Sequence, residues 1–313
     1  MADITHTAVL GAGTIGASWT ALFLASGRSV AVYDPAEGAQ DTVRAYIDQA
    51  WQTMGALGLT ARGNPDRVTF VRSAREAVEG AGFIQENVPE RLPVKHALFA
   101  EIEPAVAPDA IVASSASGLT LGQMQAGWEN PGRFILGHPF NPPHLIPLVE
   151  VMGNGLTDPG AVPAAEQFYK DIGKVTIRVN KEVPGHVANR LQAAVWREAI
   201  HLVLSGVASV GDVDKAMSAG PGLRWAVMGP TTLFSLGAGS GGLAAFCEHF
   251  ADTFNGWWDD LGSPKLTPEV SEILVNGLAE AKGDMSVEEL AAQRDAKIVK
   301  LQRALADMEK EQE

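Results

Sequence analysis

The sequence predicts two domains, an α/β domain with a mainly parallel sheet followed by an all-α domain. Three observations support this prediction. Short apolar segments alternate with amphipathic ones through the first half of the chain, and strand-like segments stop near residue 179. A chain of 313 residues is also about two domains long. We expect residues 1–183 to form the first domain and residues 184–313 the second.

The elements of the first domain follow from changes in hydrophobic period. Short apolar runs predict strands at Thr7–Leu10, Ser29–Tyr33, Val68–Val71, Gly82–Gln85, Ile111–Ala113, Arg133–Gly137 and Val175–Val179. Helical periodicity between them is clearest at Thr14–Ser26, Asp41–Met54 and Val94–Ala105. Strands that alternate with helices form a parallel sheet covered on both faces. From Val187 the pattern is helical, and the chain ends in a charged amphipathic segment, Ser286–Glu313.

Composition limits the class of partner. Hydrophobic residues make up 46% and charged residues 19%, which is enough for a full core and too apolar for disorder. The net charge of −13 argues against a nucleic-acid partner, because phosphate binding needs a basic face. The single cysteine, Cys247, cannot form an intrachain disulfide, and no signal-peptide pattern or membrane-spanning stretch is evident. We therefore expect a cytoplasmic protein.

A glycine-rich loop joins the first predicted strand to the first predicted helix. In a GxGxxG loop the first glycine makes the tight turn, and the second lets the backbone approach a pyrophosphate. The third allows close helix–strand packing, while the helix N-terminus supplies N–H donors. The alternative is a set of ordinary turn glycines, but the strand and helix stand on the correct sides. We predict a Rossmann-like dinucleotide site formed by Gly11, Gly13, Thr14, Ile15 and Gly16.

Asp34, at the end of the second predicted strand, indicates which dinucleotide binds. Its carboxylate can accept both adenosine ribose hydroxyls of NAD. A 2′-phosphate at that point would be repelled by roughly 4 kcal/mol at about 4 Å and an effective dielectric near 20. No arginine follows immediately. The sequence favours NAD over NADP.

The most informative segment is FILGHPFNPPHLIPLVEVM, residues 134–152. His138 ends one apolar run, a Pro-rich turn follows, and Glu150 lies inside a second apolar run. A buried carboxylate is costly unless it is paired, and the simplest partner is an imidazole brought alongside by the turn. A carboxylate behind a histidine fixes the tautomer and stabilises the imidazolium, which suits a general base. The segment indicates an enzyme.

Five motifs in this order resemble the 3-hydroxyacyl-CoA dehydrogenase family. They are GAGTIG at 11–16, SSASGL at 114–119, GHPFNPP at 137–143, LVEV at 148–151 and PGHVANRL at 184–191. The resemblance implies an NAD-binding domain followed by a helical domain that mediates homodimerisation. It also implies four roles in the site: the catalytic base His138, its orienting acid Glu150, the substrate-oxygen contact Ser117 and the active-site Asn189.

The chemistry of alcohol oxidation supports these roles. The O–H proton must leave as hydride leaves carbon, and a neutral imidazole accepts it near neutral pH. Ser117 and Asn189 can hold the oxygen so that the C–H bond points at the nicotinamide. Taken singly, Ser117 reads equally well as a turn residue, Asn189 as a helix cap and His138 as a core histidine. Together and in order they favour the catalytic interpretation.

Three more residues match family positions beside the cofactor. Glu90 and Lys95 lie in PERLPVKHALF, and their alternative is an exposed ion pair that opens a helix. Ser115 offers a hydroxyl near the nicotinamide side, at a position where acyl-CoA enzymes of the family usually have asparagine. We expect all three to contribute to the cofactor site.

Two departures from the acyl-CoA pattern indicate a free acid as substrate. Acyl-CoA members of the family carry a lysine-rich region that helps to hold the CoA phosphates, but Asp41–Asn64 contains no lysine. Arg224, ahead of an MGP motif, resembles the branch of L-carnitine dehydrogenase and L-gulonate 3-dehydrogenase (lambda-crystallin). An arginine there can form a bidentate pair with a free carboxylate, or else a structural salt bridge. We predict a small free L-3-hydroxy acid, which is carnitine-like, gulonate-like or short and aliphatic.

Aromatic residues bear on the choice among these acids. The trimethylammonium of carnitine would require an aromatic cage. Trp225 is a substrate-binding candidate, and further candidates for the cage are Trp196, Phe140 and Phe234. Aromatics at helical spacing are more often core residues, so gulonate and short aliphatic acids stay open.

Two rival functions and one exclusion complete the expectations. The enzyme alternative is an L-3-hydroxyacyl-CoA dehydrogenase that acts on a thioester. The non-enzyme alternative is a crystallin-like NAD-binding structural protein, against which the intact catalytic set speaks. No metal is expected, because His138 and His144 lack a convincing third ligand.

Overall fold

The structure is a computed structural model that describes residues 4–311, which form two compact units. The first unit runs to Val187 and resumes at Arg294, and the second is Ala188–Gln293. This division differs from residues 1–183 and 184–313 mainly because the end of the last helix belongs to the first unit. The domain boundary that the sequence suggests, between residues 183 and 184, stays a prediction.

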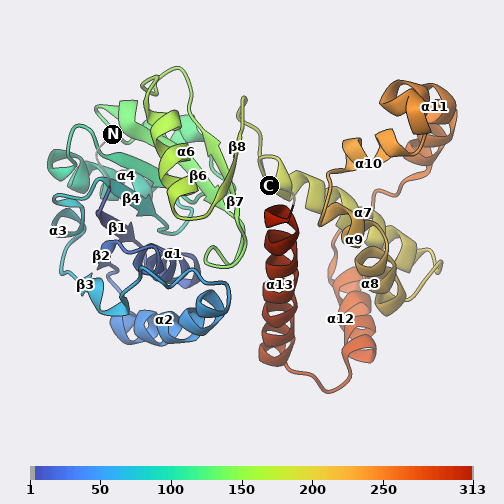
Figure 1. The fold of residues 1–313 in the computed structure, drawn as a ribbon, viewed down its shortest axis with the longest axis horizontal. Coiled ribbons are helices and arrows are strands. Elements are labelled where there is room, and N and C mark those ends of the chain that lie inside the picture. Colours follow the sequence, from blue (N-terminus) through green and yellow to red (C-terminus); the bar gives the residue numbers. More distant parts are fainter. Residues whose placement is uncertain (1–3, 312–313) are drawn as a thin grey trace. The chain divides into compact units, whose positions relative to one another are not determined.

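One eight-stranded sheet forms the centre of the first unit within the described residues (Figure 1). Its strand order is β3-β2-β1-β4-β5-β6-β7-β8. In this sheet β6 and β7 pair antiparallel, and the other neighbours pair parallel. The bounds are β1 His6–Leu10, β2 Ser29–Tyr33, β3 Val68–Phe70, β4 Phe83–Glu86, β5 Ile111–Ser114, β6 Phe134–Pro139, β7 Leu148–Met152 and β8 Val175–Arg178. The predicted mainly parallel sheet is confirmed.

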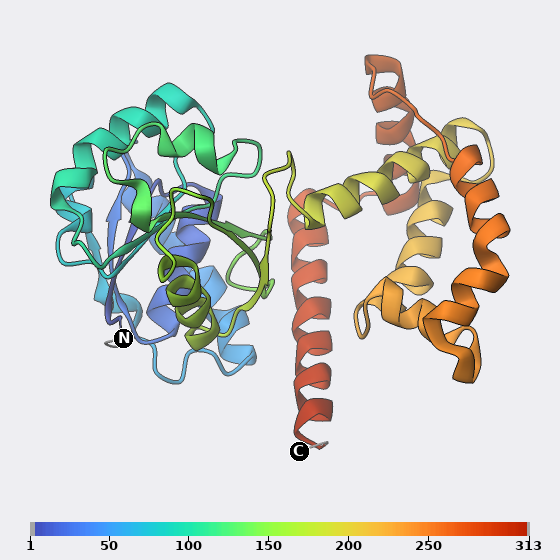
Figure 2. The same cartoon turned by 90° about the horizontal axis from the view of Figure 1, so that it is seen from above.

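Helices cover both faces of this sheet (Figures 1 and 2). Successive strand residues point to opposite faces, so Val9 packs into one apolar cluster, and Ala8 and Leu10 into the other. The cluster of Val9 includes α1, α2 and α6, and the cluster of Ala8 includes α3, α4 and α5. Their bounds are α1 Thr14–Ala25, α2 Ala39–Ala56, α3 Ala74–Val78, α4 Leu92–Ile102, α5 Leu121–Gln125 and α6 Ala161–Asp171. Single 3₁₀ turns lie at Pro65–Arg67, Glu103–Ala105 and Pro131–Arg133.

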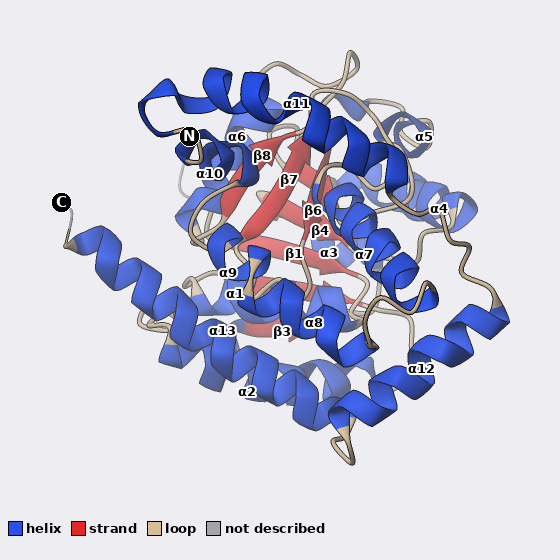
Figure 3. Ribbon diagram, turned by 90° about the vertical axis from the view of Figure 1, so that its right-hand side faces the viewer, coloured by secondary structure: helices blue, strands red, loops and turns tan. Residues whose placement is uncertain are grey.

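The second unit is helical over its described residues, because the last strand ends at Arg178 (strands red in Figure 3). Its helices are α7 Ala188–Leu204, α8 Val210–Ala219, α9 Pro221–Trp225, α10 Pro230–Leu236, α11 Gly242–Asp260 and α12 Pro268–Lys282, with a 3₁₀ turn at Gly239–Gly241. Side-chain caps fix two of the helix starts, since Ser209 accepts from Asp212 N and Thr267 from Val270 N. The predicted all-α second half is confirmed.

The last helix, α13 (Val287–Lys310), reaches back into the first unit. Val299 is buried there, and Gln302 Nε2 donates to the Leu145 carbonyl at 2.7 Å. This contact ties α13 to the loop between β6 and β7. No helix among residues 4–311 combines the length and the apolar character that a membrane crossing requires.

Candidate active site

The glycine loop between β1 and α1 is shaped for close backbone approach. Gly11 has φ +81°, and a Cβ there would lie 2.8 Å from the Asn87 carbonyl carbon. A Cβ on Gly16 would lie 1.9 Å from the Gly11 carbonyl oxygen, so only glycine allows this helix to pack on its strand. At Gly13 a Cβ would meet nothing within 4 Å, which leaves open space beside the loop. Open space at the second glycine is what a loop of this kind needs for a pyrophosphate to approach the backbone.

The helix end and Asp34 complete the fit to a dinucleotide. Gly13 caps α1 without a side-chain hydrogen bond, so the cap leaves the helix N-terminus to an anion. Asp34 accepts from Ala12 N at 2.6 Å and from Ala36 N at 2.8 Å. A carboxylate has about four acceptor positions, so Asp34 can brace the loop and still accept from ribose hydroxyls. These residues suit NAD, and the roles of Gly11, Gly13, Thr14, Ile15, Gly16 and Asp34 as its ligands stay predictions.

His138 and Glu150 face each other across the antiparallel pair of β6 and β7. The register places them directly opposite, and cross-strand neighbours on one face are close enough to touch. His138 Nδ1 lies 2.7 Å from Glu150 Oε2, and both side chains are buried. The second carboxylate oxygen, Oε1, accepts from Val187 N at 2.9 Å. The sheet therefore produces the buried histidine–carboxylate pair that the sequence suggested.

The electrostatics of the pair suit a general base. Burial lowers the pKa of His138 below its ordinary value, and the hydrogen bond and charge of Glu150 oppose this shift without cancelling it. The imidazole is therefore neutral at pH 7. Because a carboxylate can only accept, the Nδ1 proton belongs to the contact with Glu150. The other nitrogen, Nε2, presents its lone pair and can take a proton.

Ser117 is oriented by Glu90. The Ser117 amide and hydroxyl both donate to Glu90 Oε1 at 2.7 Å, and Gly118 N donates to Oε2 at 2.8 Å. Burial alone would raise the pKa of Glu90, but these three hydrogen bonds outweigh it and hold the pKa below the ordinary value. A hydroxyl that donates to Glu90 keeps its acceptor capacity. In this structure Glu90 acts on the loop that carries Ser117.

Lys95 pairs with Glu86 and does not form the ion pair with Glu90 that we considered as an alternative. Lys95 Nζ lies 2.6 Å from Glu86 Oε1 and 2.7 Å from Oε2, and it also donates to the Val88 carbonyl. Ser114 Oγ donates to Glu86 Oε2 at 2.6 Å. Lys95, Glu86 and Ser114 are all buried. With the three ammonium donors engaged, Lys95 fixes the end of β4 beside the glycine loop, and a direct contact with the cofactor stays a prediction.

The Ser115 hydroxyl is occupied inside the protein. It donates to Asn87 Oδ1 at 2.7 Å and accepts from Gln85 Nε2 at 2.9 Å and Trp19 Nε1 at 3.2 Å. One donor and two acceptor positions are the full capacity of a hydroxyl. Ser115 therefore braces Asn87, next to the Gly11 turn, and its predicted cofactor contact has no support in this geometry.

Three predicted site residues belong to the second unit. Asn189 lies in the first turn of α7, two residues after Val187 along the chain. Arg224 and Trp225 end the short helix α9, and both side chains are exposed. Phe234 packs with Phe246 and Phe254 in an aromatic cluster, which fits a core role better than a cage. Their contacts with a substrate stay predictions.

Sequence reasoning missed His186. Its ring centroid lies 5.2 Å from that of His138, and the side chain is only 2% exposed. Its Nε2 lies 3.2 Å from the Ala116 carbonyl, which can only accept. The one available signal was a histidine directly after glycine in the PGHVANRL motif.

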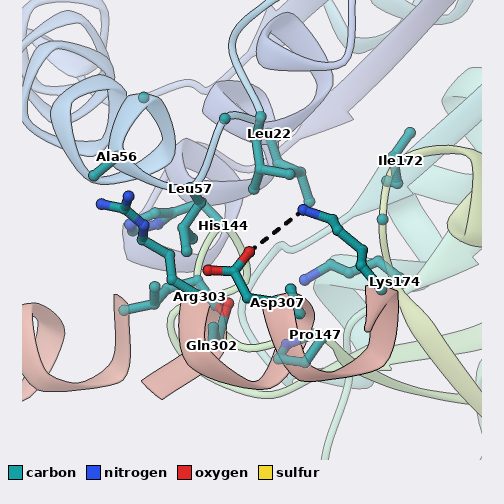
Figure 4. A pocket seen from close by; sticks show the side chains of 17 residues that line it. Leu22, Ala56, Leu57, His144, Pro147, Ile172, Lys174, Gln302, Arg303 and Asp307 are labelled. Carbon is teal, nitrogen blue, oxygen red and sulfur yellow. Dashed lines mark hydrogen bonds and ion pairs between the residues drawn. The ribbon is translucent and has the colours of Figure 1, made fainter. Parts of the chain in front are cut away.

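A cavity of about 490 Å³ lies elsewhere in the first unit (Figure 4). Its lining includes Leu57, His144, Lys174 and Arg303, but not His138, Glu150 or Asp34. Lys174 Nζ donates to the Pro143 and Ile146 carbonyls, and His144 Nδ1 lies 2.9 Å from Ser18 Oγ. These contacts hold the loop that connects His138 with Glu150, and the cavity is lined by residues of this loop but not by the catalytic pair.

Comparison with known families decides the class. Residues 6–183 match the NAD binding domain of 3-hydroxyacyl-CoA dehydrogenase, and residues 185–283 match the C-terminal domain. The chain belongs to the 3-hydroxyacyl-CoA dehydrogenase family. This match confirms the resemblance, the fold class and the NAD cofactor predicted from the sequence. The chain is an NAD-dependent dehydrogenase of this family.

Individual relatives lie near one branch of the family. L-carnitine dehydrogenase of Streptomyces coelicolor is 44% identical over 302 residues, which cover 96% of this chain and 95% of that protein. L-carnitine dehydrogenase of Pseudomonas putida is 41% identical over 293 residues, which cover 94% of this chain and 91% of that protein.

Two solved structures share the architecture. 5-Formyl-3-hydroxy-2-methylpyridine 4-carboxylic acid 5-dehydrogenase, an NAD⁺-dependent dismutase, superposes with a TM-score of 0.82 at 31% identity, covering 97% of this chain and 99% of that one. FadB2 of M. tuberculosis superposes with a TM-score of 0.67 at 29% identity, covering 88% of this chain and 94% of that one.

Proposed function

We propose that this dehydrogenase oxidises the 3-hydroxyl of a small free L-3-hydroxy acid to the 3-keto acid, with L-carnitine as the first substrate to test. The observation that carries the reaction is the buried 2.7 Å contact between His138 Nδ1 and Glu150 Oε2. The choice of carnitine draws on relatives named L-carnitine dehydrogenase that match 94–96% of this chain at 41–44% identity.

The roles of the residues follow from the contacts. His138 Nε2 takes the hydroxyl proton, and Glu150 stabilises the imidazolium that forms. Nicotinamide adenine dinucleotide, when held by the glycine loop and Asp34, supplies the acceptor for the hydride that leaves C3. In the proposed reaction the Ser117 hydroxyl, which donates to Glu90 in this structure, donates instead to the reacting oxygen. One proton and one hydride leave the alcohol, which balances its oxidation to a ketone.

The first unit offers little to a CoA phosphate at the expected place. Helix α2 contains no lysine, and its one arginine, Arg44, lies over the Phe70 ring at 5.2 Å. A multiply charged CoA needs several free cations, whereas a free acid needs partners for one carboxylate. This contrast supports a free 3-hydroxy acid over the thioester.

Four residues are proposed as further substrate contacts. Asn189 helps to hold the reacting oxygen, and Arg224 pairs with the carboxylate. Trp225 supplies an aromatic face to a quaternary ammonium, as does Phe140, whose ring lies 6.3 Å from that of His138.

The second unit is proposed to form a homodimer, as in the family, in a cytoplasmic protein. Its helices expose large apolar side chains, among them Trp257 and Trp258 on α11 and Val275 on α12. Single exposed apolar residues are ordinary, but adjacent tryptophans on one helix suit an interface. Light scattering coupled to size exclusion tests this, and a mass equal to one chain would refute the dimer.

A substrate screen tests the function. We would measure NADH formation at about pH 9, where release of a proton favours oxidation. The substrates are L-carnitine, L-gulonate, L-3-hydroxybutyrate and L-3-hydroxybutyryl-CoA. A free acid with kcat/KM at least about tenfold above that of the thioester supports the proposal. A thioester far better than every free acid would overturn it, and no oxidation of any substrate would favour the structural-protein alternative.

A further inference from the structure

His186 occupies an unusual place beside the catalytic pair. It follows Gly185 in the segment that ends the first unit, and its backbone has φ +50°. A non-glycine residue in the left-handed region is strained, and such strain concentrates where the surroundings hold a residue for a purpose. The next residue, Val187, donates its N–H to Glu150 Oε1 at 2.9 Å. The strained residue is thus joined directly to the acid that orients His138.

The two nitrogens of the buried His186 ring have different surroundings. The ring lies 5.2 Å from that of His138, between centroids, and its Nε2 donates to the Ala116 carbonyl at 3.2 Å. Among the described residues, the buried Nδ1 has no hydrogen-bond partner. Buried polar atoms are nearly always paired, so an unpaired one beside a catalytic residue indicates a group that a ligand supplies.

The chemistry of the substrate limits what that group is. A 3-hydroxy acid has a hydroxyl and a carboxylate, and in the proposed reaction the hydroxyl goes to His138. The carboxyl carbon lies two C–C bonds of about 1.5 Å each from C3. Two rings whose centroids are 5.2 Å apart can therefore bind the two groups of one molecule.

We propose that His186 is a substrate-binding residue whose Nδ1–H donates to the carboxylate of the 3-hydroxy acid. This inference rests on the proposed function, because it concerns an acid and not a thioester. His138 is the titratable group beside the ring. Two carboxylates are linked to it indirectly: Glu150 accepts from the N–H of Val187, the next residue, and Glu90 accepts from the N–H of Ser117, which follows Ala116. Because Nε2 already donates to the Ala116 carbonyl, this contact requires a proton on both ring nitrogens, so the acid binds with uptake of one proton from solution and its carboxylate pairs with the resulting imidazolium.

The contact predicts discrimination between charged and neutral substrates. A thioester or amide carbonyl is uncharged, so it gains much less from a protonated imidazole than a carboxylate does.

The test compares L-carnitine with its primary amide, or L-3-hydroxybutyrate with its amide if that acid ranks first in the screen. The variants are His186→Asn, because asparagine tolerates positive φ, and His186→Gln as a second replacement. In both we expect kcat/KM for the acid to fall about 10- to 100-fold, mainly through KM, and kcat/KM for the amide to change by less than about threefold. The matched control is His249→Asn at an exposed position on α11.

The ratio of acid to amide separates the possible outcomes. A loss confined to the acid supports the contact, since a merely structural role would lower both substrates together. An equal loss on acid and amide, or no loss on either in a folded variant, overturns it. If the proposed function itself is wrong, the wild-type enzyme will have a higher kcat/KM for the thioester than for the free acid, and this result is independent of the His186 variants.

Discussion

Replacing Glu150 by glutamine tests the catalytic pair most severely. Glu150 accepts from His138 through Oε2 and from Val187 N through Oε1. Glutamine has one oxygen and cannot accept through both atoms. If its NH₂ group faces His138, it donates to Nδ1 and moves the ring proton to Nε2, which is the wrong tautomer for a base. If its oxygen faces His138, the NH₂ group opposes the Val187 N–H.

The magnitude follows from the charge that is lost. The atoms are 2.7 Å apart, and the charge centres of imidazolium and carboxylate lie about 4 Å apart. At an effective dielectric near 20 the attraction is about 4 kcal/mol. A fully formed imidazolium in the transition state would then cost about 10³-fold in kcat, and a half-formed one about 30-fold. We expect a fall between these limits.

The assay is the pH dependence of kcat and kcat/KM for the best substrate. Burial already lowers the pKa of His138, so the acid limb in wild-type enzyme lies below about pH 6.5. Glu150 raises that pKa, and without its charge the limb moves to still lower pH while the plateau falls. Affinity for NADH serves as the control, since Asp34 and the glycine loop are untouched. A kcat within about threefold of wild type and an unmoved limb would refute the reasoning.

Three other perturbations have defined signs. Asp34→Ala removes the carboxylate that accepts from Ala12 N and is proposed to accept from the ribose hydroxyls, so we expect the NAD:NADP ratio of kcat/KM to fall at least about tenfold. The control is Glu37→Ala at an exposed position, which leaves this ratio unchanged. An unchanged ratio in Asp34→Ala would contradict the assignment of Asp34 to the ribose. Burial lowers the pKa of Lys174 to about 7 in the folded protein. Between about pH 7 and 10.5 the unfolded chain therefore binds one more proton than the folded protein, and the free energy of unfolding rises by up to about 1.4 kcal/mol per pH unit. Urea unfolding across that pH range measures this dependence, and we expect Lys174→Met to remove it. Equal slopes of unfolding free energy against pH in the two proteins would contradict a neutral buried Lys174. Burial also lowers the pKa of His144 to about 4, so its contribution is complete above about pH 6.5 and is lost as pH falls toward 4. His144→Gln flattens the acid side of the stability curve, and a variant that loses stability as steeply as wild type there would argue against a buried neutral imidazole.

The fold and the catalytic pair could be predicted because each depends on local patterns. Short apolar runs located most of the strands, and helical periodicity located the helices. An apolar run around Glu150 implied a buried carboxylate beside His138. The antiparallel strand β7 was not predicted as a strand, although it is what places the two residues opposite each other. A turn brings two segments together, but sequence alone does not state their register.

Contacts that depend on tertiary packing could not be predicted from the sequence. Lys95 pairs with Glu86 and not with Glu90, which is nearer in the sequence, because β4 ends beside the start of α4. The return of α13 to the first unit depends on packing of Val299 and on a hydrogen bond to Leu145. His186 became visible only through its unpaired nitrogen and its positive φ. These contacts and this backbone conformation depend on how the segments pack together, which neither composition nor residue spacing specifies.

The free-acid activity and the role of His138 can be tested together, by measuring kcat/KM for L-carnitine and for L-3-hydroxybutyryl-CoA with wild-type enzyme and His138→Gln. We expect wild-type enzyme to prefer the free acid, and His138→Gln to lose about 10²- to 10⁴-fold in kcat/KM on that acid while still binding NADH. A wild-type preference for the thioester would contradict the free-acid proposal, and near wild-type kcat in His138→Gln would contradict the role of His138 as the base.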